Sequence, residues 1–433
     1  MIKNVSRRSL VKGAAGAAAV GAASSRFFAP GIIGAQGSDV ELVYWTAFGS
    51  GANGDAQAAL IEEFNVLDNG ITVTSTAYAS YEEVANAILT GLDSGDVPHA
   101  ATLSDVWWFT FYLRQALADL TPYVDTPEDY VQSLYVEYER NGGQYGVPFA
   151  RSTPLFYYNV EAFDAAGVDP AALATWSEFA EVAPTLVEGS DAVYSFGFGN
   201  AASYGAWTMH GPIWAFGGNY SDSDFNILVN QPEAVAAGEF MRAMINEGQA
   251  GAIASPQDDF VAGTLAAMIA STGSLGNVTA NSQVEFATAF LPEEVQFGCP
   301  TGGTGLSVLN SAGEEEIAAA AEFLSFCTNT ENAATWSQNT GYMPVRTSAV
   351  ESDEYQAFLD ANPNNRVAIE QLPKTQPQDS ARVFIPNGDQ NLGRAWEQIL
   401  VNDMPAQEAF DEVAALLEED KVPVMEALSV IEG

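Results

Sequence analysis

Positive charge is the scarcest property of this sequence. Its 433 residues include 15 Lys and Arg against 56 Asp and Glu, which gives a formal net charge of −41. A chain this acidic repels phosphate backbones and anionic lipid headgroups, so nucleic acid and anionic membranes are disfavoured as partners. The composition is typical of a salt-adapted protein, because high ionic strength screens the repulsion among surface carboxylates.

Cysteine and histidine are almost missing as well. Cys299 and Cys327 are too few for a disulfide framework, and a bridge between them is the alternative to two buried thiols. With only His99 and His210, a histidine-based metal site is not expected. The sequence has no G-x-S-x-G, H-E-x-x-H or P-loop motif, which leaves a hydrolase with paired carboxylates as the catalytic alternative. We predict no metal, no cofactor and no enzymatic activity.

Long apolar runs are missing from the body of the chain, so no membrane-spanning helix is expected there. At the N-terminus, the twin arginines Arg7 and Arg8 precede an Ala- and Gly-rich apolar run from Gly13 to Ala23. This order predicts a twin-arginine export signal over residues 1–35. The chain after residue 35 carries ten basic and 56 acidic residues, so each of its ten cations is a candidate for a specific role.

Strand and helix signals alternate through the first half of the chain. Residues 40–45, 71–78 and 100–103 are predicted strands, because they are short apolar or β-branched runs. Ser80 with Glu83, and Thr175 with Glu178, match the capping box that begins a helix. The alternation predicts an α/β fold with ligands at the carboxyl ends of the strands.

Three extended passages interrupt this pattern and indicate crossings between two domains. They are residues 142–159, 296–310 and 339–345. In the last passage Gly341 can end a preceding helical run from Gly313 to Gln338, and Pro344 cannot continue it. Two lobes joined by several strands can close on a ligand as a hinge. We predict lobe I over residues 36–149 and 299–338, and lobe II over residues 150–298 and 339–433.

Five segments carry a resemblance to a known family: FARSTPLFYYN, IASTGSL, PTGGTGL, ENAATW and NTGYMPV. In order and spacing they resemble the extracellular solute-binding proteins of ABC importers, and most closely the glycerol-3-phosphate-binding branch. The resemblance implies a two-lobed periplasmic-binding-protein fold of type II, with a mixed sheet flanked by helices in each lobe. It also implies a location outside the cytoplasm, an ABC permease as membrane partner, and no catalysis.

The resemblance implies nine ligand-binding residues: Tyr81, Asp105, Ser152, Tyr204, Trp207, Ser271, Gly303, Tyr342 and Arg382. Tyr204 departs from the branch, which often has Trp there, and this leaves the exact ligand open. The implied ligand is sn-glycerol-3-phosphate or a glycerophosphodiester. A neutral oligosaccharide is the alternative, because aromatic side chains and carboxylates also suit sugars.

The implied site fits a phosphate ester chemically. Arg382 is expected to supply the positive charge for the phosphate, as a lone guanidinium in an acidic chain; a surface salt bridge is the alternative. Ser152, Ser271 and the N–H of Gly303 are short donors, with turn hydroxyls and a strand bulge as the structural alternatives.

Other residues have two interpretations. Asp105 either accepts hydrogen bonds from ligand hydroxyls at the polyol end or caps the helix that follows it. The four aromatic residues of the implied site either face the ligand or pack in the core. Arg151 either reaches the anion or pairs with an acidic residue across the cleft. The aromatic run from Val106 to Leu113 is predicted to be core.

Overall fold

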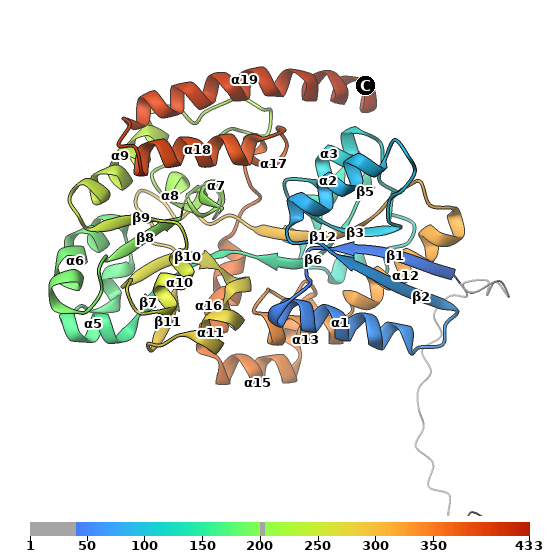
Figure 1. Cartoon of the computed structure of the whole chain (residues 1–433), viewed down its shortest axis with the longest axis horizontal. Coiled ribbons are helices and arrows are strands. Elements are labelled where there is room, and N and C mark those ends of the chain that lie inside the picture. The colour runs from blue at the N-terminus through green and yellow to red at the C-terminus, as the bar shows by residue number, and fades with distance from the viewer. Residues whose placement is uncertain (1–39, 200–203) are drawn as a thin grey trace, which may run out of the picture. The chain divides into compact units, whose positions relative to one another are not determined.

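The structure is a computed structural model that describes residues 40–199 and 204–433, so the predicted export signal lies outside the described residues. Figure 1 shows two mixed five-stranded sheets. The first sheet has the order β2-β1-β3-β12-β6, in which β12 runs antiparallel to both of its neighbours. Its strands are β1 (Val40–Thr46), β2 (Ile71–Ala77), β3 (Ala100–Ser104), β6 (Val147–Ser152) and β12 (Gly302–Val308).

The second sheet has the order β11-β7-β10-β8-β9, with β7 antiparallel to both β10 and β11. Its strands are β7 (Pro154–Asn159), β8 (Phe196–Gly199), β9 (Ala250–Ile253), β10 (Ala267–Ser271) and β11 (Phe286–Ala289). A small hairpin pairs β4 (Glu139–Arg140) with β5 (Gly143–Gln144). One residue, Thr153, separates β6 of the first sheet from β7 of the second, so the chain passes between the sheets there without a loop.

Helices flank both sheets, which confirms the predicted α/β class (Figure 1). In the first half they are α1 (Gly51–Asn65), α2 (Tyr81–Gly91), α3 (Trp108–Leu113), α4 (Gln132–Tyr135), α5 (Val160–Ala166), α6 (Trp176–Gly189), α7 (Gly205–Thr208) and α8 (His210–Ala215). In the second half they are α9 (Pro232–Asn246), α10 (Pro256–Val261), α11 (Leu275–Asn281), α12 (Glu314–Cys327), α13 (Thr330–Thr340), α14 (Thr347–Glu351), α15 (Asp353–Ala361), α16 (Pro363–Gln371), α17 (Ser380–Val383), α18 (Gly388–Leu400) and α19 (Ala406–Ile431). Short 3-10 turns are Pro127–Asp129, Val136–Tyr138, Pro170–Leu173, Thr272–Ser274 and Leu372–Lys374.

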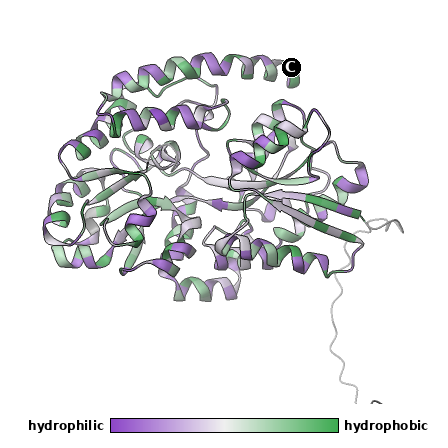
Figure 2. Cartoon of the chain, in the orientation of Figure 1, coloured by the Kyte–Doolittle hydropathy of each residue, from purple (hydrophilic) through white to green (hydrophobic). Residues whose placement is uncertain are grey.

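The helix turns alternate between hydrophilic and hydrophobic residues, as expected for helices that bury one face (Figure 2). None of the helices among the described residues is long and apolar enough to cross a membrane.

Both predicted N-caps are confirmed, but neither glutamate bonds the N–H of its own N-cap residue as a full capping box requires. The Ser80 hydroxyl accepts a hydrogen bond from the N–H of Glu83 at 3.2 Å, and the Glu83 carboxylate reaches back to the N–H of Ala79 at 3.0 Å. Thr175 accepts from the N–H of Glu178 at 3.0 Å. The first of these caps matters for function, because it fixes the start of α2 and therefore the position of Tyr81.

The helical run predicted from Gly313 to Gln338 is wrong in one respect, because it is two helices. α12 ends at Cys327, and Asn329 begins α13 by accepting a hydrogen bond from the N–H of Asn332 at 2.8 Å. An Asn side chain that bonds a nearby N–H starts a new helix instead of continuing the old one. The predicted stop is confirmed, because Gly341 ends α13 with φ at 90°, in the left-handed region.

The aromatic run is core, as predicted: Trp108, Phe109, Phe111 and Tyr112 are buried. Cys299 and Cys327 are both buried free thiols, so the alternative of a disulfide between them is excluded.

The passage between the sheets is fastened by buried polar contacts. Gln371, which is fully buried, donates to the Thr153 hydroxyl at 2.8 Å and to the Pro154 carbonyl at 2.9 Å, and it accepts from the N–H of Leu291 at 3.1 Å. These bonds join the chain where it leaves the first sheet to the segment that follows β11. The C-terminal helix α19 lies beside α18 and extends to α3, where Glu432 forms an ion pair with Arg140 at 2.7 Å (Figure 1).

Candidate functional site

A pocket of about 580 Å³ brings together all nine residues that the resemblance implied. Ser104 ends β3 and Ser152 ends β6, while Ser271 ends β10, so the pocket lies at strand ends, where ligands of α/β proteins bind. The beginnings of α2 and α18, the turn of α17 and Tyr342, two residues after the end of α13, also line it. The sequence therefore placed every one of these side chains at a single cavity.

Two tyrosines form one part of the wall. The hydroxyl groups of Tyr81 and Tyr342 lie 3.3 Å apart, and both rings pack edge-on against Phe48. Burial raises the pKa of each phenol above its ordinary value of 10, so both stay neutral and can donate hydrogen bonds. Gly273 allows this arrangement, because a Cβ there would lie 2.7 Å from the Tyr342 ring.

Short groups stand beside these tyrosines. The Ser271 hydroxyl accepts from the N–H of Gly273 at 3.0 Å, and Ser152 is 3% exposed at the end of β6. Gly303 has φ at 107°, and a Cβ there would lie 2.1 Å from the Ala150 carbonyl oxygen. Only glycine fits that position, which explains the glycine pair in the sequence. This part of the wall is made of neutral hydrogen-bonding groups.

Arg382 is not a lone guanidinium, and this corrects the expectation from the sequence. Its side chain is 4% exposed; Nε lies 2.7 Å from Asp389 Oδ1, and Nη1 lies 3.5 Å from Asp105 Oδ2. Gln378 links the group, because it donates to Asp105 and accepts from Arg382. Burial alone would lower the pKa of Arg382, but the two carboxylates outweigh burial and raise it. The guanidinium therefore keeps its positive charge, and the carboxylates of Asp105 and Asp389 balance that charge within the protein.

The sequence analysis assigned Arg382 to the phosphate end of the ligand and Asp105 to the polyol end. That separation is wrong, because the two side chains lie 3.5 Å apart. Asp105 is also not a helix cap, because α3 begins at Trp108 with Trp107 as its N-cap. The surface salt bridge considered for Arg382 is excluded by its burial.

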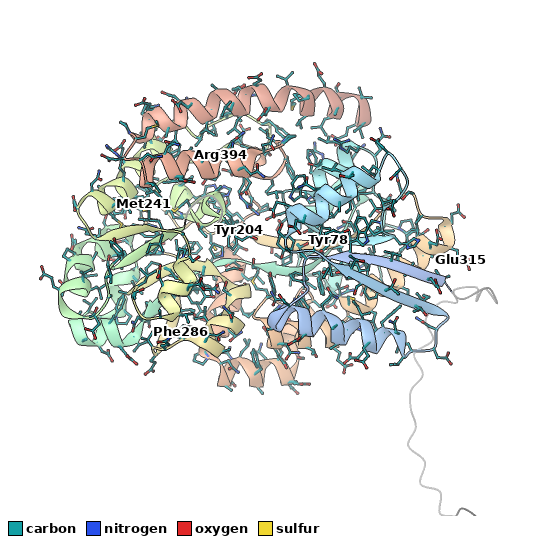
Figure 3. All side chains as sticks on the ribbon, in the orientation of Figure 1. Tyr78, Tyr204, Met241, Phe286, Glu315 and Arg394 are labelled. Atoms are coloured by element: carbon teal, nitrogen blue, oxygen red, sulfur yellow. The ribbon has the colours of Figure 1, made fainter. Side chains whose placement is uncertain are left out.

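Tyr204 and Trp207 contribute unequally to the pocket wall. Trp207 is 6% exposed and its Nε1 donates to the Thr301 carbonyl at 3.0 Å, while Gly302 lets the ring approach, since a Cβ there would lie 2.4 Å from Nε1. Tyr204 is 49% exposed with φ at 55°, and Figure 3 shows it in the central part of the view. Trp207 therefore offers the pocket a fixed ring, and Tyr204 is the exposed member of the pair.

Sequence reasoning missed several polar residues at or beside this pocket, among them the following four. Asp389 and Glu82 line the pocket as carboxylates, Ser104 lines it as a buried hydroxyl, and Gln378 joins Asp105 to Arg382. Glu82 was detectable, because it follows Tyr81 in the first turn of α2. Nothing in the sequence pointed to Asp389, whose place depends on how α18 packs.

Negative charge predominates in the pocket. Among its described lining residues, Glu82, Asp105, Asp258 and Asp389 are acidic and Arg382 is the single basic one. Burial raises the pKa of Asp389 above its ordinary 3.8, while Arg382 opposes that rise and Asp105 and Glu82 add to it. Across residues 40–199 and 204–433 there is no group of three or more His, Cys, Asp or Glu that could hold a metal ion.

Arg151 pairs with an acidic residue, as its second interpretation predicted, but not across the pocket. Arg151 is completely buried outside the pocket, with Nη2 2.6 Å from Glu137 Oε2 and Nη1 3.0 Å from the Tyr138 hydroxyl. It pairs with an acid within the protein.

Comparison with known proteins identifies the family. The sequence profile described as bacterial extracellular solute-binding protein matches residues 59–366, which is most of the chain. The chain belongs to this family. It is therefore a binding component of an ABC importer and not an enzyme, it acts outside the cytoplasm, and its partners are a small molecule and a membrane permease.

Individual relatives agree with this assignment. The solute-binding protein is 26% identical over 357 residues to the sn-glycerol-3-phosphate-binding periplasmic protein UgpB of Salmonella typhimurium, covering 78% of this chain and 81% of that one. It is 27% identical over 359 residues to UgpB of Yersinia pestis, with the same coverage.

A solved structure is more similar. UgpB from Mycobacterium tuberculosis in complex with glycerophosphocholine superimposes with a TM-score of 0.84 at 38% identity, covering 90% of this chain and all of that one. The cyclic α-maltosyl-1,6-maltose binding protein from Arthrobacter globiformis superimposes with a TM-score of 0.76 at 21% identity, covering 92% and 100%. At that identity the second comparison shows the fold alone, and together they confirm the two-lobed solute-binding architecture.

Proposed function

We propose that this solute-binding protein captures a glycerol phosphate ester, either sn-glycerol-3-phosphate or a glycerophosphodiester, and delivers it to an ABC importer. The observation that carries the proposal is the convergence of all nine implied residues on one pocket. The UgpB relatives support the ligand class.

The pocket offers different chemistry to the two ends of such a ligand. The hydroxyls of Tyr81 and Tyr342, with Ser152, Ser271 and the N–H of Gly303, are neutral donors for phosphate oxygens. The glycerol hydroxyls fit the charged end, since Asp105 accepts hydrogen bonds and Arg382 donates them.

Charge favours a diester over the monoester. Free glycerol-3-phosphate carries about two negative charges at neutral pH, and a phosphodiester carries one. Four carboxylates line the pocket with one arginine, so each additional ligand charge costs binding energy. A diester whose other substituent is cationic, like the ligand of the mycobacterial relative, suits this balance best.

A neutral oligosaccharide is the second candidate, and the excess of carboxylates beside the Trp207 ring is the observation that favours it. Losing the hydrogen bonds of Arg382 does not by itself separate the two candidates, because this side chain is paired with carboxylates and would serve hydroxyls of either ligand.

Calorimetric titration at high salt with glycerophosphocholine, glycerol-3-phosphate and maltose tests the proposal. We expect the tightest binding with glycerophosphocholine, weaker binding with glycerol-3-phosphate, and no heat with maltose. Tyr342→Phe is expected to weaken phosphate binding, whereas Tyr355→Phe, which removes a hydroxyl that pairs with Ser337 at 2.7 Å, serves as the matched control. Heat with maltose alone would refute the glycerophosphate assignment.

We further propose that binding closes two lobes about the predicted boundaries, lobe I at residues 36–149 and 299–338 and lobe II at 150–298 and 339–433. The passage at Thr153 and its Gln371 contacts support a hinge there. Small-angle scattering checks this: the radius of gyration is expected to fall on addition of ligand, and an unchanged value would exclude closure.

Export by the twin-arginine route and adaptation to high salt complete the proposal. The twin arginines Arg7 and Arg8 support the first, and the strongly acidic composition supports the second. Replacing both arginines with lysine is expected to retain the protein in the cytoplasm, and lowering the salt concentration is expected to lower the unfolding temperature.

A further inference from the structure

One buried hydroxyl in the pocket lacks a partner. Ser104 is the last residue of β3 and precedes Asp105 in the sequence, and both residues line the pocket. It is 4% exposed, and its Oγ has no hydrogen-bond partner among the described residues. The backbone carbonyl of Ser104 is occupied, since it accepts from the N–H of Trp107 at 2.9 Å. The side chain alone is left with unused hydrogen-bonding capacity.

A buried hydroxyl without a partner destabilises the folded chain, because it has lost its water and gained nothing. Such a cost is retained where another molecule supplies the missing bond. We propose that Ser104 binds the ligand directly. The inference rests on the proposed function insofar as it uses the same pocket.

The neighbouring groups indicate which part of the ligand Ser104 contacts. The Asp105 carboxylate follows it in the chain, and Arg382 with its second carboxylate, Asp389, completes that wall. A phosphate next to Asp105 would be repelled, whereas a ligand hydroxyl can donate to that carboxylate. The Ser104 hydroxyl can donate to the oxygen of the same ligand hydroxyl. Asp105 would accept a hydrogen bond from one glycerol hydroxyl, and Ser104 would donate a hydrogen bond to the same hydroxyl. The pair therefore selects against a ligand that lacks this hydroxyl.

The chain provides a matched control in Ser307. This residue is fully buried in β12, on the same sheet, and its Oγ also has no hydrogen-bond partner within the part of the chain that the structure describes. It lies against Gly146, outside the pocket. Ser104→Ala and Ser307→Ala therefore make the same chemical change in the same sheet, inside and outside the site.

The test measures the affinity of the full-length exported protein for glycerophosphocholine, and the unfolding temperature without ligand, for the wild type and both variants. Ser104→Ala is expected to weaken binding about tenfold, the size of one neutral hydrogen bond, while Ser307→Ala leaves affinity within about twofold. Neither variant is expected to unfold at a lower temperature than the wild type in the absence of ligand, because each loses an unpaired buried hydroxyl.

Two analogues of glycerophosphocholine, each lacking one glycerol hydroxyl, locate the contact. For the analogue that lacks the hydroxyl bound by Ser104, the affinities of Ser104→Ala and of the wild type are expected to differ by less than about twofold, because the partner of the serine is already missing.

Two results would overturn the inference: an unchanged affinity of Ser104→Ala for whichever ligand the wild type binds, or a lower ligand-free unfolding temperature, which would reveal a partner within the protein. Failure of the proposed function looks different. In that case the wild type itself binds neither glycerophosphocholine nor glycerol-3-phosphate, and the ligand-free unfolding temperature still decides whether the hydroxyl is unpaired.

Discussion

Two buried arginines, Arg151 and Arg382, show how this acidic protein uses its few cations. Arg151 is 0% exposed beside Glu137, and Arg382 is 4% exposed beside Asp105 and Asp389. In each pair burial opposes the charge, and the carboxylates outweigh it and raise the pKa of the arginine. The difference lies in what the carboxylates face. Those of Arg382 line the pocket, whereas Glu137 does not.

This difference separates an ion pair buried away from the pocket from one that lines it. Arg151 extends from β6 immediately before the passage at Thr153, and its backbone carbonyl accepts from the N–H of Met343 at 2.8 Å. It therefore stabilises the region where three segments meet. Arg382 is carried by the short helix α17, and its charge balances acids that line the pocket. The two sites are expected to respond differently to the same kind of change.

Removing Arg151 is expected to have the largest effect. Arg151→Met keeps apolar volume but leaves the Glu137 carboxylate buried without its counter-ion, which costs about 3–5 kcal/mol of folding stability. Urea unfolding measures this loss. The affinity of the folded fraction for glycerophosphocholine is expected to stay within about threefold of wild type, because neither residue lines the pocket.

A double variant provides the control. Arg151→Met combined with Glu137→Leu replaces the whole pair with apolar groups and is expected to recover most of the lost stability. A loss that persists in the double variant would show that the Arg151 contacts with Tyr138 matter more than the ion pair.

Removing Arg382 is expected to have the next largest effect, and on a different quantity. Arg382→Met leaves Asp105 and Asp389 unbalanced in the pocket, so binding of an anionic ligand should weaken by about 3 kcal/mol, or more than a hundredfold. Calorimetry on the folded protein measures this change.

Arg242→Met is the comparison for that variant, since Arg242 pairs with Glu239 and Asp403 on the surface and should leave affinity unchanged. Equal affinity losses in the Arg151 and Arg382 variants would contradict the distinction between the two sites.

The sequence predicted most of what depends on local chemistry. The N-caps at Ser80 and Thr175 and the stop at Gly341 follow from the bonds those residues make with near neighbours, and all three are confirmed. The division at Asn329 was missed because the Ala-rich run on one side and the ENAATW run on the other both favour helix. A single side-chain cap decided that point.

The site was predicted by a different route. Its nine residues came from order and spacing shared with a family, and composition alone would not have chosen Tyr342 among 16 tyrosines. The expectation that Arg382 is a lone guanidinium was wrong, because the scarcity of cations in the sequence does not show which acids lie beside it. Asp389 lies at the beginning of α18, and it enters the pocket because this helix start packs against Arg382 of α17, a tertiary relation that sequence patterns do not encode.

Lowering the pH is expected to give the smallest effect on stability and on ligand affinity, and it compares the buried carboxylates Glu137 and Asp389 directly. Burial raises the pKa of both Glu137 and Asp389 above their ordinary 4.5 and 3.8, so the folded protein holds protons that the unfolded chain has lost. Each group therefore lowers the free energy of unfolding as pH rises through its folded pKa. Each group should lower the free energy of unfolding by at most about 1.4 kcal/mol per pH unit in this range.

Ligand affinity should sense only one of them. As pH falls through the raised pKa of Asp389, its protonation removes a negative charge from the pocket, and binding of glycerophosphocholine should become tighter because its diester stays ionised. Asp389→Asn is expected to flatten this pH dependence, and Glu137→Gln is expected to leave it unchanged while altering the pH dependence of unfolding. If Glu137→Gln flattened the binding curve instead, the two buried arginines would belong to one coupled network, and the pocket would extend electrostatically into the passage between the sheets.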